Sequence, residues 1–255
     1  MSSRFSRIGL RLAFLSALLL SPECRSQYWS FPAPLPPDRY GDVVIDRATR
    51  TGDTLPVAFS HWSHRMRHTC RVCHLELEFE MKSNATPITE KANVEGKFCG
   101  AAGCHDGKAA FGHSRQNCDR CHLGSAHDAS LDFGRLKRFP GSGFGNHVDW
   151  TRALQVRLIR PRDYLVSPRG AMAFDRKLDL GAEWSGIPPA IFPHKAHVAW
   201  LDCANCHPDL FNIQKKTTKH FSMTLSLEGQ FCGVCHLAIA FPLQDCKRCH
   251  PTLTQ

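Results

Sequence analysis

The stretch Cys70-Arg71-Val72-Cys73-His74 is the first of five segments in which two cysteines, with two residues between them, are followed directly by a histidine. The other four begin at Cys118, Cys203, Cys232 and Cys246. A sixth segment, Cys99-Gly-Ala-Ala-Gly-Cys104-His105, is a stretched form with four small residues between the cysteines. The six segments together contain twelve of the thirteen cysteines, and only Cys24 lies outside them.

This spacing is typical of covalent haem c attachment, in which two thiols each bond a vinyl group of one porphyrin and the adjacent histidine binds its iron. The stretched segment fits if its four small residues bulge outward. The sequence therefore predicts six haems c. The expected attachment residues are Cys70, Cys73, Cys99, Cys104, Cys118, Cys121, Cys203, Cys206, Cys232, Cys235, Cys246 and Cys249, and the expected iron ligands next to them are His74, His105, His122, His207, His236 and His250.

Zinc sites and disulfides are the two other uses of so many cysteines. Zinc is held by clusters of four Cys and His ligands, a scheme that gives no role to a histidine after every second cysteine. An exported chain can form disulfides, but a bridge across two residues would close a strained loop. We therefore favour haem.

The chain contains an internal repeat with an offset of 133 residues. It matches Phe59 with Phe192, His61 with His194, His64 with His197, and the first motif of each copy with that of the other, without a gap as far as Cys99 and Cys232. Each copy holds three motifs. The paired histidines lie three residues apart, on neighbouring faces of a helical turn, so that they can reach two different irons. The ordinary alternative, surface or core histidines, does not explain their recurrence.

Both copies resemble the trihaem cytochrome c-seven domain, a shortened relative of tetrahaem cytochrome c-three. The resemblance rests on the Phe-x-His-x-x-His opening, the first motif, the Gly-x-Phe-Cys-Gly approach to the second motif and the Ala-Phe before the third. It implies that the first histidine of each pair completes the first haem and the second completes the second. Carried over, His61 and His194 serve the first haems, and His64 and His197 serve the second haems.

The sixth ligand of each third haem departs from this pattern. In the family it lies about sixteen residues after the first proximal histidine, and in the second copy that position is Met223, with His220 as the rival. In the first copy it is Glu90, a poor ligand for low-spin haem. We expect Met81 to substitute, with three histidines as alternatives: His113, His127 and His147. A methionine ligand would raise the potential of its haem relative to neighbours with two histidines.

The fold class expected is mainly irregular chain with short α-helices, arranged as two tandem trihaem multihaem-cytochrome units packed around covalent haems. So little protein per haem cannot build a conventional sheet or bundle around each cofactor. The expected divisions are a signal peptide (1–26), an N-terminal extension (27–55) with a short strand at 41–45, unit 1 (56–122), a connector (123–188) with a helix near 149–154, and unit 2 (189–255). Trp150 and Trp184 are candidates for covering haem edges, but we expect them to serve in ordinary packing.

The beginning of the chain reads as an export signal, because three arginines precede an apolar run at 12–20 that is too short to span a bilayer. A lipid-modified Cys24 is the weaker alternative, since Glu23 stands where a small residue is expected. The formal charge is +9, of which residues 1–26 supply +3 through four Arg and one Glu. Haem propionates would offset the remainder, so the basic balance does not indicate nucleic-acid binding.

These features predict a periplasmic or extracellular one-electron carrier or conduit in anaerobic respiration or metal reduction, with no transmembrane segment in the mature chain. Expected partners are redox proteins, among them a membrane quinol-oxidising complex or an outer-membrane conduit. One alternative is an oxidoreductase with an open-site haem, which the third haem of the first copy would have to supply. Another is a cytochrome subunit of a larger membrane or filament assembly.

Overall fold

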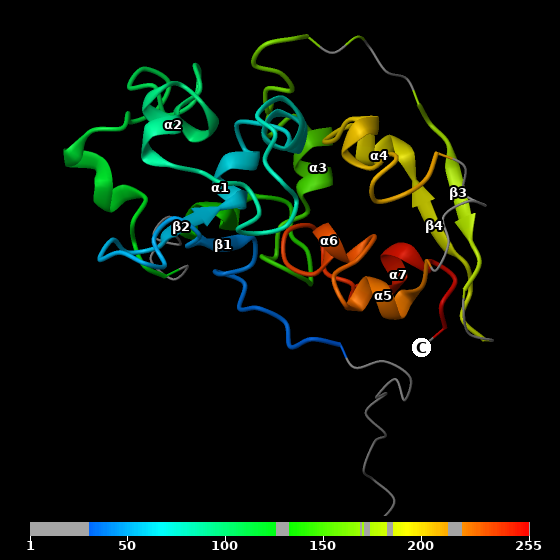
Figure 1. Ribbon diagram of the computed structural model, residues 1–255. Helices are drawn as coiled ribbons and strands as arrows, with labels where there is room; N and C mark the ends of the chain where they lie inside the picture. The colour runs from blue at the N-terminus through cyan, green and yellow to red at the C-terminus, as the bar shows by residue number, and fades with distance from the viewer. Residues whose placement is uncertain are drawn as a thin grey trace, which may run out of the picture. The chain divides into compact units, whose positions relative to one another are not determined.

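The computed structural model describes residues 31–125, 133–168, 170, 174–182, 186–213 and 221–254. Short helices and two two-stranded sheets are joined by irregular chain (Figure 1). This confirms the mainly irregular fold with short α-helices that the sequence predicts. In the described part of the chain, no helix has both the length and the apolar character needed to cross a bilayer.

The first repeat opens with a small antiparallel sheet. Strand β1 (Asp42–Ile45) pairs with β2 (Val57–Ser60), with Asp42 opposite Ser60. Strand β2 runs directly into helix α1 (His61–Arg65), which carries the paired histidines. The strand expected at 41–45 is therefore confirmed, and it supports the strand that leads into the histidine pair.

The second repeat opens in the same way. Strand β3 (Lys177–Leu180) pairs with β4 (Ala190–Pro193), and β4 runs into helix α4 (His194–Val198) (Figure 1). Lys177 lies opposite Pro193, the residue that corresponds to Ser60. Both pairs of histidines thus begin a one-turn helix at the end of a paired strand.

Two further helices occupy corresponding places in the repeats, α2 (Glu90–Val94) and α5 (Met223–Leu227). Each is preceded by a hydroxyl residue whose oxygen accepts a hydrogen bond from a backbone N–H of the first turn, Thr89 from Ala92 and Ser222 from Leu225. The remaining helical segments are Val72–Glu76, Phe98–Gly100, Arg115–Arg120, Phe133–Arg138, Cys203–Asn205, α6 (Gly233–His236) and α7 (Cys246–Cys249).

A glycine lets the chain pass close to helix α2 in the first repeat, and another does so at helix α5 in the second. A Cβ on Gly100 would lie 1.8 Å from the carbonyl oxygen of Asn93, and a Cβ on Gly233 would lie 1.8 Å from that of Ser226. These glycines are 133 residues apart, as are the two carbonyls. Both positions therefore require glycine because of the close approach of backbone to backbone.

The connector packs through helix α3 (Trp150–Gln155), which Asp149 caps by accepting a hydrogen bond from the N–H of Arg152. Trp150 and Ala153 share a buried cluster with Trp62 of the first repeat, and the Trp150 indole donates to Asn146. The predicted helix and the packing role of Trp150 are confirmed. Trp184 lies outside the described residues.

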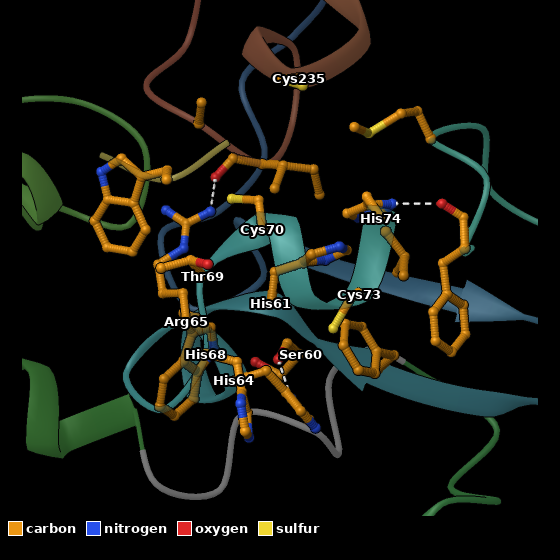
Figure 2. Close-up of a pocket in the computed structure, with 18 of the residues that line it drawn as sticks. Ser60, His61, His64, Arg65, His68, Thr69, Cys70, Cys73, His74 and Cys235 are labelled. Atoms are coloured by element: carbon orange, nitrogen blue, oxygen red, sulfur yellow. Dashed lines mark hydrogen bonds between the residues drawn. The ribbon is translucent and has the colours of Figure 1, made fainter. Parts of the chain in front are cut away.

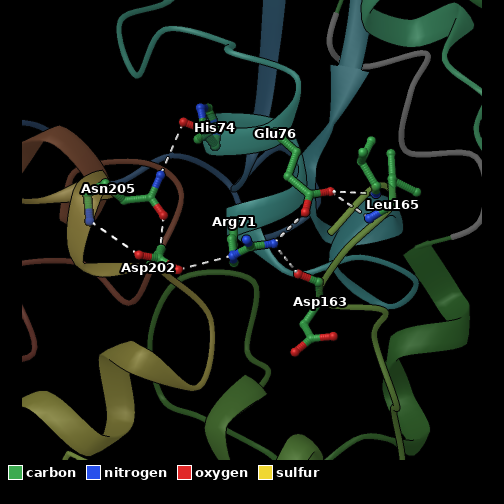
Figure 3. Close-up of polar contacts among 9 residues, drawn as sticks. Arg71, His74, Glu76, Asp163, Leu165, Asp202 and Asn205 are labelled. Carbon is green, nitrogen blue, oxygen red and sulfur yellow. Dashed lines mark hydrogen bonds and ion pairs between the residues drawn. The ribbon is translucent and has the colours of Figure 1, made fainter. Parts of the chain in front are cut away.

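A buried polar cluster joins the two repeats at their first motifs (Figure 3). Arg71 pairs with Glu76 at 2.7 Å and, across the repeat boundary, with Asp202 at 3.1 Å. Asn205 donates a hydrogen bond to the backbone carbonyl of His74 at 3.1 Å. The segment that carries the first motif of one repeat thus contacts that of the other through side chains that are largely removed from water.

Candidate haem-attachment sites

The six motifs share a local backbone geometry. In five of them the N–H of the histidine donates to the carbonyl oxygen of the first cysteine, with distances of 2.8–2.9 Å: His105 to Cys99, His122 to Cys118, His207 to Cys203, His236 to Cys232 and His250 to Cys246. In the remaining motif, Val72, Cys73 and His74 lie within the helical segment Val72–Glu76. Each motif is therefore a tight turn that holds its cysteines and histidine together.

The stretched motif keeps this contact in spite of its two extra residues, because Gly103 adopts a φ of 83°. The outward bulge expected for its small residues is only partly correct. Ala102 is exposed, but Gly100 and Ala101 are buried. The physical reason for the burial is the packing of Gly100 against the carbonyl of Asn93.

Ten histidines share a second feature, a ring Nδ1 within hydrogen-bonding distance of a backbone carbonyl. Because a carbonyl only accepts, Nδ1 carries the proton and the lone pair of Nε2 is left for a metal. Six are the motif histidines, with Nδ1–O distances of 2.6–3.1 Å: His74, His105, His122, His207, His236 and His250. Four are the paired histidines, at 2.8–3.0 Å: His61, His64, His194 and His197.

Three pairs of these rings face each other at a distance suited to an iron between them. The ring centres of His61 and His74 are 6.5 Å apart and the rings are nearly parallel, at 5°. His64 with His105 and His197 with His236 are each 6.2 Å apart. Two metal–imidazole bonds of about 2 Å each, together with the radius of each ring, place the ring centres roughly 6 Å apart. Among the described residues, no such ring pair forms between His194 and His207.

A phenylalanine holds each pair of histidines in place. The ring of Phe59 lies 4.8 Å from that of His61 and 4.3 Å from that of His64. Phe192 makes the equivalent contacts with the second pair, at 4.8 Å and 4.2 Å. This is the physical role of the aromatic residue that recurs in the repeat.

Burial gives the histidines the protonation state that a metal ligand needs. It lowers the pKa of His61 to about 3 and that of His64 and His236 to about 4, so these rings are neutral at neutral pH. Burial also raises the pKa of the Cys73 and Cys235 thiols to about 12. These thiols are therefore protonated at neutral pH in the protein without cofactor.

The described residues also lack the side-chain groupings that a zinc site or a set of disulfides would require. No three side chains among His, Cys, Asp and Glu gather in a way that could hold a metal ion. None of the twelve motif cysteines forms a disulfide among the described residues. Neither a protein-only zinc cluster nor a disulfide framework is therefore present in this part of the chain.

A cavity of about 1570 Å³ runs past the motifs of both repeats. Ligand pockets usually measure about 300–1,000 Å³, so this space suits several large groups. Its wall includes buried polar atoms with no partner among the described residues, namely Ser60 Oγ, Trp62 Nε1, Arg65 Nε, His68 Nδ1 and Thr69 Oγ1. Large apolar surfaces, free imidazole nitrogens and unpartnered polar atoms together fit a haem, which has an apolar ring and anionic propionates.

Within the described part of the chain, the structure does not bring the ligands expected for the third haem of each repeat into facing pairs with His122 and His250. Met81 and His113 line the cavity that Cys121 also lines, whereas His147 is exposed and lies outside that wall. Met223 is the first, half-buried residue of α5 and corresponds to the exposed Glu90 at the start of α2. His127 and His220 lie outside the described residues.

Two residues that the sequence analysis passed over stand out in the same cavity. Arg65 and His68 are inward-facing polar residues that no motif contains (Figure 2). The signal for them was present in the repeat, because the corresponding residues of the second copy are Val198 and Leu201. Polar residues that only one copy has are candidates for a role outside the basic unit.

Comparison with known proteins gives one family match. The family described as "Cytochrome c7 and related cytochrome c" matches twice, at residues 57–123 and 190–251, which together make up half of the chain. No curated protein matches the chain.

Fragments of one multihaem cytochrome are similar among solved structures. The C-terminal hexaheme fragment of GSU1996 is 24% identical, with 86% of this chain and 99% of that chain covered and a TM-score of 0.28. The N-terminal hexaheme fragment is 25% identical, with 83% and 99% covered and a TM-score of 0.27. TM-scores this low do not establish a common overall backbone, so membership of the family rests on the sequence match.

Proposed function

This chain belongs to the cytochrome c7 family of multihaem electron-transfer proteins with covalently bound haem c, and from that premise we propose that it is a hexahaem conduit for single electrons. The observation that carries the proposal is the set of ten histidines whose Nδ1 atoms are held by backbone carbonyls. Six of them follow a cysteine pair, as haem attachment requires. Four come from the two paired openings, where sixth ligands are needed.

The part of the polypeptide in this function is to tether the porphyrins, to ligate their irons and to enclose the haems. The cysteine pairs fix each porphyrin, and the carbonyls aim each imidazole. When bound, haem supplies the redox chemistry, because its iron changes by one electron. In our assignment His61 and His194 complete the first haem of each repeat, and His64 and His197 complete the second. The spacings of three facing ring pairs support this assignment.

For the third haems we propose Met81 in the first repeat and Met223 in the second. The Met81 side chain lines the same cavity as Cys121, as that of its rival His113 also does. Met223 is favoured because it starts α5 at the position that the family uses. Two methionine-ligated haems would lie at higher potential than their neighbours, so each repeat would contain a potential step.

The physiological setting that we propose is the periplasm or the cell exterior, in anaerobic respiration or metal reduction. The arginine-rich start and short apolar run of 1–26 support export. The partners would be redox proteins, such as a membrane quinol-oxidising complex or an outer-membrane conduit.

An open iron site is the second candidate, and one observation favours considering it. His122 and His250 have no facing histidine ring among the described residues, unlike three of the other motif histidines. A third haem without a sixth protein ligand would let a small molecule reach its iron. We place this below the conduit because Met81 and Met223 are present to close those sites.

Haem stoichiometry and spectroscopy test the proposal. The mature protein should have the mass of the chain plus six haems, and a Cys118→Ser/Cys121→Ser variant should carry five. The oxidised protein should be low-spin throughout, and its reduced form should not bind carbon monoxide. Fewer than six haems in the wild-type protein would contradict the hexahaem assignment, and a high-spin haem that binds carbon monoxide would favour the open-site alternative.

The third-haem ligands are tested separately. The sulfur-to-iron charge-transfer band of a methionine-ligated haem should weaken in Met223→His and in Met81→His, and disappear when the two are combined. A band that survives the double substitution would show that neither methionine is the ligand.

A further inference from the structure

Arg65, the last residue of α1, lies partly buried at the boundary between the two repeats. Its Nη2 donates to the backbone carbonyl of Ile239 in the second repeat at 2.8 Å. Its guanidinium lies over the ring of Trp150, 5.2 Å from the ring centre. Figure 2 shows it beside Cys70, with Cys235 also at the pocket. Arg65 therefore stands between attachment sites that belong to different repeats.

The positive charge of Arg65 has no carboxylate to balance it among the described residues. The groups that interact with it electrostatically are Cys70, Cys235 and Tyr40, and it also acts on His61 and His236. Its Nε atom is buried and has no hydrogen-bond partner. A cation that is partly removed from water and has no anion beside it is unfavourable.

Arg71 shows how the same fold accommodates a buried arginine whose charge is balanced by acidic side chains. Its guanidinium reaches both Glu76 and Asp202 and also donates to the carbonyl oxygen of Asp163. Both arginines belong to the first repeat and face the second, yet only Arg71 has acidic partners. The difference indicates that the anion for Arg65 comes from outside the polypeptide.

The atoms around Arg65 point to an anion with oxygen acceptors. His68 Nδ1, Thr69 Oγ1 and Trp62 Nε1 are buried in the same cavity wall and have no partner. Each of these groups can donate a hydrogen bond. In the second repeat the corresponding residues are Leu201, Asp202 and Lys195, and Arg65 is replaced by Val198. The site is therefore a property of the first repeat and not of the trihaem unit in general.

We propose that Arg65 binds a propionate of one of the two haems attached at Cys70/Cys73 and Cys232/Cys235, and thereby raises the potential of that haem. This inference rests on the proposed haem attachment at these motifs. A guanidinium is planar and can donate two parallel hydrogen bonds to a carboxylate. It therefore orients a propionate better than the point charge of a lysine ammonium would. Arg65 is a positioning residue, because it acts on the iron through the propionate and its charge.

The consequence concerns the step between the repeats. A positive charge near the iron disfavours the ferric state relative to the ferrous state, and the neutralised propionate does so too. Arg65 would therefore hold the haem at the repeat boundary at a higher potential than an otherwise similar haem in the second repeat, where valine replaces it.

The experiment compares Arg65→Gln with Arg65→Lys, and uses Arg50→Gln as a control that removes the same charge from an exposed site. Haem content is measured first, by mass. Potentials are then resolved haem by haem in an NMR-monitored redox titration. Redox difference infrared spectra, with the haem carboxylates labelled with carbon-13, report on the propionates.

The expected result is that all variants carry six haems, and that in Arg65→Gln one of the two named haems shifts to lower potential and one propionate band moves. Arg65→Lys should show a smaller shift, and it also serves as the test if the glutamine variant fails to fold. Potentials equal to those of Arg50→Gln would overturn the proposal, as would a shift confined to other haems. A shift with unchanged propionate bands would also overturn it, since Arg65 would then act as a bare charge. Fewer than six haems in the wild-type protein would instead contradict the proposed function.

Discussion

Arg71 provides a direct test of what a single buried side chain contributes. Its substitution by methionine keeps the volume but leaves Glu76 and Asp202 buried without a cation; the side chains of Arg71 and Glu76 are only 9% and 8% exposed. Breaking a buried pair in this way typically costs about 3–5 kcal/mol. We expect Arg71→Met to lower the free energy of unfolding by that amount in guanidinium titrations followed by circular dichroism.

The control is Arg50→Met, which removes the exposed pair between Arg50 and Asp46, where the arginine side chain is 60% exposed. Such pairs contribute about 0–1 kcal/mol. Equal losses in the two variants would mean that the cluster at the repeat boundary does not stabilise the fold.

Asp42 gives the stability a dependence on pH. Burial raises the pKa of its carboxyl to about 6, and the neighbouring Ser60 hydroxyl opposes that rise only in part. The unfolded pKa is lower, so the folded protein binds the extra proton, and the contribution of this group to stability is lost as pH rises through about 6. We expect Asp42→Asn to be more stable than the wild-type protein by about 1–2 kcal/mol at pH 8, allowing for partial solvation of the carboxyl.

That difference between Asp42→Asn and the wild-type protein should vanish below about pH 4, where both states bind the proton. Denaturant titrations at several pH values measure it. A difference independent of pH would show that Asp42 does not titrate in this range.

At this scale the sequence predicts which residues would hold porphyrin and iron, because their spacing is the one that the cofactor requires. It did not predict Arg65. The side chain looks like any charged residue at the end of a helix, and its hydrogen bond to the carbonyl of Ile239 joins residues 174 positions apart. Contacts of that range leave no local pattern.

The helices depend on two glycines that allow the backbone to approach closely. A Cβ on Gly233 would collide with the carbonyl of Ser226 in α5, so Gly233→Ala must displace α5 or the motif at Cys232. Overpacking of this kind typically costs about 1–3 kcal/mol. We expect that loss in denaturant unfolding, together with reduced haem occupancy at Cys232 and Cys235 by peptide mass analysis.

The matched control is Gly52→Ala, because a Cβ at Gly52 would meet nothing within 4 Å. Gly100→Ala should behave like Gly233→Ala, since the two positions correspond in the repeat. An unaffected Gly233→Ala protein would mean that the loop moves aside at little cost.

Among the elements, β1 and α3 were predictable because each is marked by its own residues, a Val-Val-Ile run and an aspartate cap. Strand β3 was not predicted. Lys177–Leu180 has no strand signal strong enough to separate it from the connector, and its pairing with β4 supplies the order. The short helices at the motifs follow from the turn that haem attachment needs.

The molecule as a whole has a small apolar core of its own. In the described chain ten hydrophobic residues are buried, and Val72 is the one large side chain among them that is almost completely so. A chain of this size would normally bury far more. We therefore expect the polypeptide produced without haem attachment to be largely unfolded, as small metal-dependent domains are without metal.

Circular dichroism and limited proteolysis of the chain expressed with and without haem maturation measure this dependence. The matured protein of the same preparation is the control. A cooperative unfolding transition in the haem-free chain would contradict the expectation. The composition already predicts this dependence on haem, because six motifs leave few residues per haem. The packing of the connector on Trp62 could not be predicted from the sequence and became visible only in the structure.

The polar cluster between the repeats also limits how many repeats could be joined by the same contact. The residue that corresponds to Arg71 in the second copy is Ala204, and the one that corresponds to Asp202 in the first copy is Thr69. In the ion pair between the copies, the first copy thus supplies the cation and the second the anion, and because equivalent segments meet, the contact is closed in kind and not head-to-tail. A further copy of the second repeat, set against the existing one, would meet alanine where an arginine is needed. Through this contact the two copies form a closed pair rather than the first links of an open chain.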